Sequence, residues 1–531
     1  MPAMPAIVAG HHHRQYLVDF KETQGAETRL LFIQQRKSRF SPDLLPVHKI
    51  AAMNLQVVHV RINDGHGQPV PARVRITDEQ GHYFPPLGRP AHLTSRHGPA
   101  SWGNVLLGDK LYAYIDGQAE FQLPAGELLV ELSKGPNYTP ISMTTHLRAG
   151  QLSLRFNMEP IARPEDEGWY AGDTSVFDCS PQVAALEGAA EGLSLVHVQA
   201  YQDIYHQPWY IDDFSAQTAA AQRQECQVSV GTRNQGGDLG ELALLYTHRV
   251  VFPLRLDHPG FEHYTVYDWC HQAHRKHGLV VWPDFQAQMN ENLVALVLGE
   301  IDAVEWAATH HWNETHINFW YHLLNAGLHV PVVGGSGKRD VSLPIGALRT
   351  YAHLGWDQPF SIAQWVAALR AGKTVVSRGP LLYCAVGTTQ VGETLEQPSG
   401  FNHDPCNIQA RMHTTNSKCT LEIVADGAVI AARADHANSI CQINTKADLQ
   451  QTGWWAARAW DEQGQLLAHT SPIYNHLARP VQRTVALAHL LQQLDGLRPI
   501  FAQAQRVETQ RQSLLHHLEE AENKLQKALC D

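Results

Sequence analysis

The sequence contains no run of 18 apolar residues, so we expect no membrane-spanning helix. It lacks a positively charged start followed by an apolar stretch, which is the pattern of a secretory signal peptide. It also lacks a long basic run, and its formal net charge is −11, which disfavours nucleic acid and anionic membranes as partners. We therefore expect a cytoplasmic protein whose partner is a small-molecule ligand, with no nucleic acid and no membrane.

The eight cysteines form no Cys-x-x-Cys pair, so neither a zinc knuckle nor a redox motif is indicated. Their wide spacing is typical of reduced, buried thiols rather than of a disulfide framework. Charged residues make up only 18% of the chain and apolar residues 44%, which argues against a disordered protein. A length of 531 residues predicts about three or four domains.

The chain begins with a segment of no clear pattern. Residues 1–52 show no sustained periodicity, and we expect an irregular N-terminal extension there. Over 53–160, apolar residues such as Val58, Val60 and Ile62 occupy alternate positions between turn signals. A period of two with polar partners is typical of half-buried strands, and it predicts a β-sandwich.

The pattern changes in the middle of the chain. Over 161–385, short apolar runs such as LSLVHVQA alternate with helical stretches that end in glycine, which predicts parallel βα units in an α/β barrel. Over 386–476 the alternation of apolar and polar residues returns, with Asp426 and Gly427 as a hairpin turn. We expect a C-terminal β-domain there.

Residues 477–531 are predicted to form a helical tail. Leu487, Leu490, Leu491 and Leu494 follow the spacing i, i+3, i+4, i+7, which places them on one face of a helix. The stripe is too short for a long coiled coil, so we expect it to dock on the body of the protein or on a second subunit. A homodimer through the C-terminal helices is one outcome.

Seven segments of this chain, among them GWYAGDTSVF, IDAVEWA and FWYHLLNAGLHVPVVGGSG, occur in the order found in one family. Together they resemble the CehA/McbA-type (carbaryl-hydrolase-like) metallohydrolases, which carry a polymerase-and-histidinol-phosphatase (PHP) type domain. The resemblance runs from about residue 55 into the tail. It implies an α/β fold with a distorted PHP-type (β/α)7 barrel and a hydrolase site at the C-terminal ends of the barrel strands.

Most metal-ligand positions that the resemblance implies hold other residues. The first-strand motif Asp-x-His-x-His keeps Asp173, but Ser175 and Phe177 stand at the two histidine positions. The Asp-His after the second strand reads Gln199-Ala200, and the Gly-Ser-Asp-x-His segment reads GSGKR. Serine is a poor ligand for a divalent transition metal and phenylalanine is none. We therefore expect a degenerate metal site with no resident cofactor.

Two sets of residues remain as candidates at the barrel mouth. Asp284, Glu305 and His310 offer carboxylate and imidazole donors, and as an alternative they hold one zinc ion. The loop of His310 also carries His311 and His316. The other set is Asp173, Ser336, Lys338, Arg339, Arg349 and Arg378. In this set, a glycine-rich turn offers backbone N–H groups to an anion, and arginine forks suit carboxylate or phosphate.

Three functional hypotheses follow from the sequence. The first is a degenerate PHP-fold protein that binds an anionic or sugar-like small molecule without metal catalysis. The second is an active ester or phosphoester hydrolase with a single-metal site rebuilt from Asp284, Glu305 and His310. The third is a structural or interaction protein in which the barrel is a spacer. The tryptophans of the barrel segments, Trp169, Trp282, Trp306, Trp312 and Trp320, are interpreted as core residues rather than ligand-binding ones.

Overall fold

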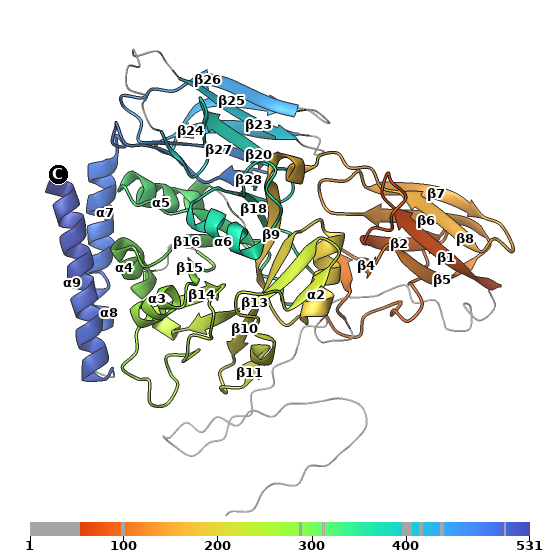
Figure 1. The fold of residues 1–531 in the computed structure, drawn as a ribbon, viewed down its shortest axis with the longest axis horizontal. Helices are drawn as coiled ribbons and strands as arrows, with labels where there is room; N and C mark the ends of the chain where they lie inside the picture. The colour runs from red at the N-terminus through yellow and green to blue at the C-terminus, as the bar shows by residue number, and fades with distance from the viewer. Residues whose placement is uncertain are drawn as a thin grey trace, which may run out of the picture. The chain divides into compact units, whose positions relative to one another are not determined.

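The computed structural model of this protein shows a mixed α/β structure in which strands predominate (Figure 1). It describes residues 54–96, 101–285, 289–310, 312, 314–395, 406–413, 418–435, 440–503 and 506–530. These residues lie in one compact unit, 53–531. The expected extension over 1–52 lies outside the described residues.

A three-stranded mixed sheet and a five-stranded antiparallel sheet form the N-terminal part. One has the order β5 (Gln118–Pro124), β1 (Leu55–Asn63), β8 (Ser153–Asn157). The other has the order β3 (Asn104–Leu107), β4 (Lys110–Ile115), β2 (Ala72–Asp78), β6 (Gly126–Ser133), β7 (Ile141–Leu147). Val58, Val60 and Ile62 are fully buried in one core shared by both sheets, which confirms the predicted alternation.

The central sheet is built largely from parallel strands. β9 (Trp169–Val176), β10 (Leu195–Gln202) and β13 (Cys226–Gln235) are parallel neighbours, and β15 (Leu279–Trp282), β16 (Ala303–Ala307) and β17 (Val332–Gly335) form a second parallel set. β14 (Glu241–Leu245) lies between the sets and is antiparallel to both neighbours. A parallel bridge from Val176 to Lys338 joins the chain after β17 back to β9, so the strands close into a ring.

Helices connect and cover these strands. They are α2 (Pro181–Ala190), α3 (Val266–Arg275), α4 (Glu291–Leu298), α5 (Glu314–Asn325) and α6 (Ile362–Arg370), with short 3-10 turns over Pro164–Glu167, Ile211–Asp213 and Gly237–Leu239. The helices predicted from TVYDWCHQAHRKHG, HINFWYHLLNAG and SIAQWVAALRAG are confirmed as α3, α5 and α6. The capping box of Thr265 and Asp268 starts α3 where the sequence changes from loop to helical spacing.

Further strands extend the central sheet. β18 (Arg349–His353) pairs antiparallel with β9, and β19 (Thr374–Ser377) pairs antiparallel with β18. The short strands β11 (Pro208–Trp209) and β12 (Ala221–Arg223) flank β10 and β13. β28 (Leu466–Thr470) pairs antiparallel with β19, so part of the C-terminal region continues the barrel sheet.

The remaining strands form the C-terminal β-region. They are β20 (Leu382–Val386), β21 (Thr389–Gln390), β22 (Thr394–Leu395), β23 (Asn407–His413), β24 (Cys419–Ala425), β25 (Ala428–Asp435), β26 (Ile440–Lys446), β27 (Trp454–Asp461) and β29 (Ile473–Asn475). β24 and β25 form a hairpin whose turn is Asp426 and Gly427, as the sequence predicts. A four-stranded sheet has the order β21-β20-β23-β26.

The tail forms α7 (Arg483–Asp495), α8 (Arg498–Phe501) and α9 (Glu508–Cys530) (Figure 1). Leu487, Leu490 and Leu494 are at most 1% exposed and belong to the same core as the residues of α3, α4 and α5. α7 contacts α5, and α9 contacts α4. The apolar stripe is therefore covered by this chain itself, and it gives no support to a dimer through the tail.

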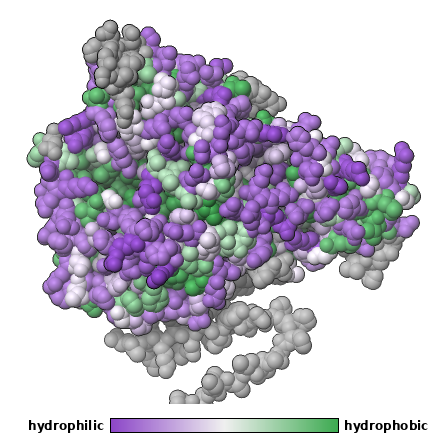
Figure 2. Space-filling model, viewed as in Figure 1, coloured by the Kyte–Doolittle hydropathy of each residue, from purple (hydrophilic) through white to green (hydrophobic). Residues whose placement is uncertain are grey.

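Aromatic side chains fill the barrel region. Trp169, Trp282, Trp306, Trp312 and Trp320 are at most 5% exposed, which confirms their interpretation as core residues. The face drawn in Figure 2 is mostly polar, with apolar residues in several small groups. Among the described residues, no helix combines the length and apolar character needed to cross a membrane.

The burial of α7 predicts a large effect of one substitution. Leu490→Ala removes a fully buried side chain, and we expect it to destabilise the protein by about 2 to 5 kcal/mol because a cavity remains. Val485→Ala on the same helix removes a side chain that is 65% exposed and should change stability by less than about 0.5 kcal/mol. Thermal unfolding followed by circular dichroism compares the two variants. Equal effects would contradict the docking of the tail on the barrel helices.

Candidate functional site

Polar side chains gather inside the carboxyl end of the parallel strands. Thr174 lies on β9, Gln199 on β10, Arg233 on β13 and Glu305 on β16, and each is at most 3% exposed. The Thr174 hydroxyl donates to Oε2 of Glu305 at 2.6 Å, and Nε2 of Gln199 donates to the carbonyl of Thr174 at 2.7 Å. The interior of the barrel therefore has a polar layer at the end where such folds carry their sites.

Glu305 is the most perturbed carboxyl of this layer. Burial raises its pKa to about 7, and the charge of Asp284 adds to the shift while that of Arg233 opposes it. Its Oε1 has no hydrogen-bond partner within the described part of the chain. A carboxyl that is half-protonated near neutral pH and has one unengaged oxygen is suited to accept or donate a proton.

Asp284 lies above this layer and joins an imidazole to a guanidinium. Its Oδ1 is 3.6 Å from Nε2 of His310, and its Oδ2 accepts from Nη2 of Arg233 at 3.1 Å. Burial alone would raise the pKa of Asp284, but the hydrogen bond from His310 and the charge of Arg233 outweigh it and lower the pKa. Arg233 also donates through Nε to Glu241 at 2.9 Å. The nearly buried Arg233 thus supplies a fixed positive charge between carboxylates.

An aromatic row lies beside this arginine. The Arg339 guanidinium stacks on the Phe177 ring, 3.7 Å from its centroid, and Arg233 lies 5.8 Å from the same centroid. The Tyr201 ring contacts Phe177 edge-on and stacks against Trp209, which is 45% exposed. Arg339 is exposed, and it forms no ion pair with any residue that the structure describes. We name Phe177, Tyr201, Trp209 and Arg339 the aromatic shelf.

Sequence reasoning did not identify Arg233, Tyr201 or Trp209 as site residues. The available signal was Arg233 itself, a charged residue within a strand, where it shares one face with Ser229 four positions earlier. Phe177 was noted only as a lost ligand. The Phe177 ring contacts the guanidiniums of Arg233 and Arg339, which are distant in sequence. Only the folded structure brings these three residues together.

Two candidate residues serve the fold itself. Oδ1 of Asp173 accepts the backbone N–H groups of Ser175 and Ser336 at 3.0 and 2.9 Å, and Oδ2 accepts that of Gly346 at 2.7 Å. Ser336 donates to the carbonyl of Ser175. The N–H of Gly337 also donates to Ser175, so the amides of this glycine-rich turn are used within the protein and do not form the anion cradle expected from sequence.

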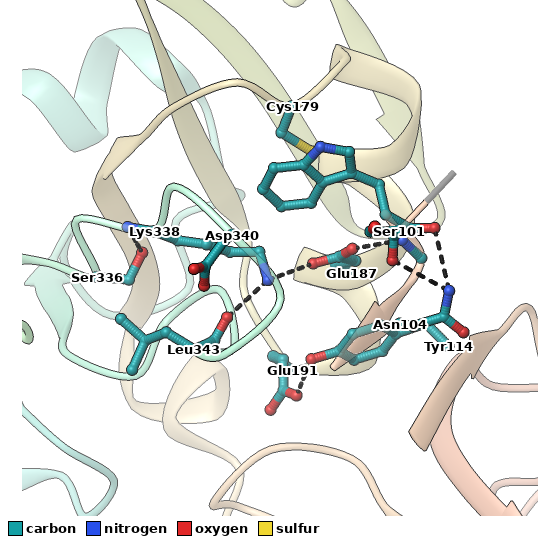
Figure 3. Close-up of polar contacts among 12 residues, drawn as sticks. Ser101, Asn104, Tyr114, Cys179, Glu187, Glu191, Ser336, Lys338, Asp340 and Leu343 are labelled. Carbon is teal, nitrogen blue, oxygen red and sulfur yellow. Dashed lines mark hydrogen bonds and ion pairs between the residues drawn. The ribbon is translucent and has the colours of Figure 1, made fainter. Parts of the chain in front are cut away.

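Lys338 is fully buried rather than exposed at the mouth. Figure 3 shows its contacts with Glu187 and Leu343. Its Nζ lies 3.4 Å from Oε2 of Glu187 on α2, donates to the carbonyl of Leu343 at 2.6 Å, and lies 4.8 Å from the centroid of Trp102. Glu187 also accepts the backbone N–H of Gly103 at 2.8 Å. Burial raises the pKa of Glu187, and the charge of Lys338 opposes the shift. This pair joins the N-terminal sheets, α2 and the chain after β17.

The other two arginines lie away from the aromatic shelf. Arg349 is 3% exposed and donates to the carbonyls of Gly346 and Glu191. Arg378 donates to the carbonyl of His310 at 2.9 Å. Of the other histidines in that loop, His311 lies outside the described residues, and so does the side chain of His316 on α5.

The multinuclear metal centre implied by the family resemblance does not fit the residues present. Both oxygens of Asp173 are occupied by backbone donors, and the Phe177 ring lies against guanidiniums. Arg233 lies against Asp284, where it would repel a cation. Among the described residues, no group of three His, Cys, Asp or Glu side chains comes together as a ligand set, and this includes Asp284, Glu305 and His310.

Comparisons with known proteins leave the family open. No protein-family model matches the chain, and no curated protein matches it. One similar solved structure is a two-domain protein from Bacteroides vulgatus ATCC 8482, described as containing a predicted PHP-like metal-dependent phosphoesterase, with 10% identity, a TM-score of 0.32, and coverage of 57% of this chain and 95% of that chain. PsfC from Pseudomonas syringae PB-5123 has 16% identity, a TM-score of 0.27, and coverage of 38% and 88%. Similarities this weak do not bear on function.

The shifted pKa of Glu305 predicts how stability depends on pH. Because the carboxyl titrates near 4.5 when unfolded and at about 7 when folded, unfolding releases a proton between these values, and stability falls as pH rises through this range. Glu305→Gln removes this titration. The free energy of unfolding of the variant should therefore rise relative to that of the wild type from pH 5 to pH 8, by up to about 3 kcal/mol.

The unfolding midpoint, measured across that pH range, checks this expectation. Glu79→Gln, at an exposed position of the N-terminal sheets, controls for the loss of a carboxylate. A difference between Glu305→Gln and wild type that stays constant with pH would show that Glu305 does not titrate in this window.

Proposed function

We propose that this chain is a PHP-type barrel protein without a resident metal that binds an anionic, ring-bearing small molecule at the barrel mouth. The observation that carries the proposal is the exposed guanidinium of Arg339, held flat on Phe177 at 3.7 Å without a carboxylate partner in the described chain. A stacked arginine keeps its fork of donors fixed for a carboxylate or phosphate.

The aromatic shelf supports a ring next to the anionic group. Trp209 stacks on Tyr201 with ring centroids 6.4 Å apart, and 45% of Trp209 is open to solvent. Exposed aromatic faces beside polar donors suit sugars and planar rings. Tyr201 is itself fixed, because its hydroxyl donates to Asp178 at 2.8 Å. A sugar phosphate combines both features that this surface would recognise.

Fixed arginines take over the electrostatic role that a metal ion has in a PHP hydrolase. Arg233 lies against Asp284 and Glu241 and contributes to the field at Glu305. Its position is set by two ion pairs, so no cation is needed to neutralise these carboxylates. The proposed function uses two groups that have no partner within the described residues, the exposed Arg339 guanidinium and Oε1 of Glu305.

Isothermal titration calorimetry with glucose 6-phosphate tests this function. We expect Arg339→Gln to weaken binding about tenfold or more, because a charge-assisted hydrogen bond contributes about 1.5 to 3 kcal/mol. Trp209→Ala should weaken it less. Arg148→Gln, at an exposed arginine in the turn after β7, is the matched control and should leave binding unchanged. Treatment with a chelator should also have no effect.

Two outcomes would contradict the proposal. An affinity that Arg339→Gln leaves within about twofold would remove Arg339 from the site. An affinity that the chelator abolishes would restore the single-metal alternative with Asp284, Glu305 and His310. Free glucose is the uncharged reference ligand, and its expected weak binding separates recognition of the anionic group from stacking.

A further inference from the structure

The structure contains a hollow that lies apart from the aromatic shelf. It has a volume of about 340 Å³ and is lined by the loop after β6, the segment before β18 and the segment after β19. Its lining includes Asn137, Tyr138, Ala162, Arg349 and Tyr383. We name this hollow the side cavity. A volume of this size is at the lower end of the range for small-molecule pockets.

Three arginines, Arg73, Arg349 and Arg378, line the side cavity together with one acidic residue, Glu191. Oε1 of Glu191 already accepts from Nη1 of Arg73 and from the Tyr114 hydroxyl, both at 2.7 Å. Glu191 therefore neutralises Arg73, and two positive charges remain without a counter-ion on the lining.

Arg349 carries the first of these charges. Its Nε and Nη1 donate to backbone carbonyls, those of Gly346 at 3.0 Å and Glu191 at 2.9 Å. It forms no ion pair with any residue that the structure describes, and its side chain also interacts with the Tyr351 hydroxyl. Since the side chain is only 3% exposed, a charge is held almost out of solvent. Burying a charge without a counter-ion is costly, and an anion bound in the side cavity would lower that cost.

Arg378 carries the second charge. Ser377 is the register partner of Arg349 on the neighbouring strand, so Arg378 follows the residue opposite Arg349. Nη2 of Arg378 donates to the carbonyl of His310 at 2.9 Å, while Nη1 donates to no residue within the described ranges. Burial lowers the pKa of Arg378, although the charge of Asp461 opposes the shift. Arg349 and Arg378 thus both belong to the lining of the side cavity, and Nη1 of Arg378 is unengaged among the described residues.

We propose that the side cavity is a binding site for a small organic dianion, a phosphate monoester or a dicarboxylate, held by Arg349 and Arg378. Two arginine forks match the charge and the oxygen geometry of such groups. Tyr138, Tyr383 and Pro380 provide apolar surface for the organic part of the ligand. The site is independent of the aromatic shelf, because none of the four shelf residues lines the side cavity.

Titration calorimetry with phenyl phosphate and with succinate tests this site. Ala162→Trp places a large side chain in the side cavity and replaces no arginine. It should weaken binding of both anions about tenfold or more. Ala149→Trp, at an exposed turn position, is its matched control. Arg349→Gln should weaken binding to a similar extent, with Arg148→Gln as the control. Phenol, which lacks the anionic group, should bind far more weakly than phenyl phosphate.

The variants separate the two sites. Binding that survives Arg339→Gln but not Ala162→Trp supports the side cavity. Binding lost in Arg339→Gln and retained in Ala162→Trp overturns the side-cavity site while leaving the proposed function intact. Failure of both anions to bind wild type at millimolar concentration also overturns it. If Arg349→Gln does not fold, Ala162→Trp decides alone.

Discussion

The buried ion pair between Lys338 and Glu187 fixes the segment on which both proposed sites depend. Neither side chain is exposed, and the pair meets Trp102 and Gly103 from the N-terminal region. Loss of one member would leave an uncompensated buried charge, at a cost of about 3 to 5 kcal/mol. Asp173 also holds the chain from Ser336 to Arg349, because its carboxylate accepts the backbone N–H groups of Ser336 and Gly346. This segment then places Arg339 on the aromatic shelf and Arg349 in the side cavity.

The residues at the barrel mouth show how buried carboxylates are neutralised by arginine side chains. Carboxylates left without a cation repel one another and resist burial, so they need another source of positive charge. Arg233 supplies it by pairing with Asp284 and Glu241, and Phe177 offers its ring to both Arg233 and Arg339. Glu305 is fully buried, and the charge of Arg233 offsets only part of the effect of burial, so its pKa is about 7.

The two proposed sites share chemistry but not surroundings. The aromatic shelf presents Arg339 to solvent beside exposed rings, whereas the side cavity holds Arg349 almost completely buried. Arg378 lies at the boundary, because it lines the side cavity and also donates to the carbonyl of His310 in the loop at the mouth. An anion bound to Arg378 would therefore act on a group that also positions His310.

The sequence by itself determined the elements and their class. Period-two alternation located the N-terminal strands, helical spacing and terminal glycines located α3, α5 and α6, and the leucine spacing identified the apolar face of the tail. These signals are local, since each depends on the few residues that share one face of one element. From residue chemistry alone, the sequence also predicted that Ser175 is a poor metal ligand and Phe177 none. Only the tertiary structure decided which partner each charged side chain has. Lys338 is buried against Glu187, Asp173 accepts backbone N–H groups of a turn, and Arg233 pairs with Asp284. Each of these partners is distant in sequence, and whether an arginine faces a carboxylate, a ring or an empty volume depends on which strands the closed sheet brings together.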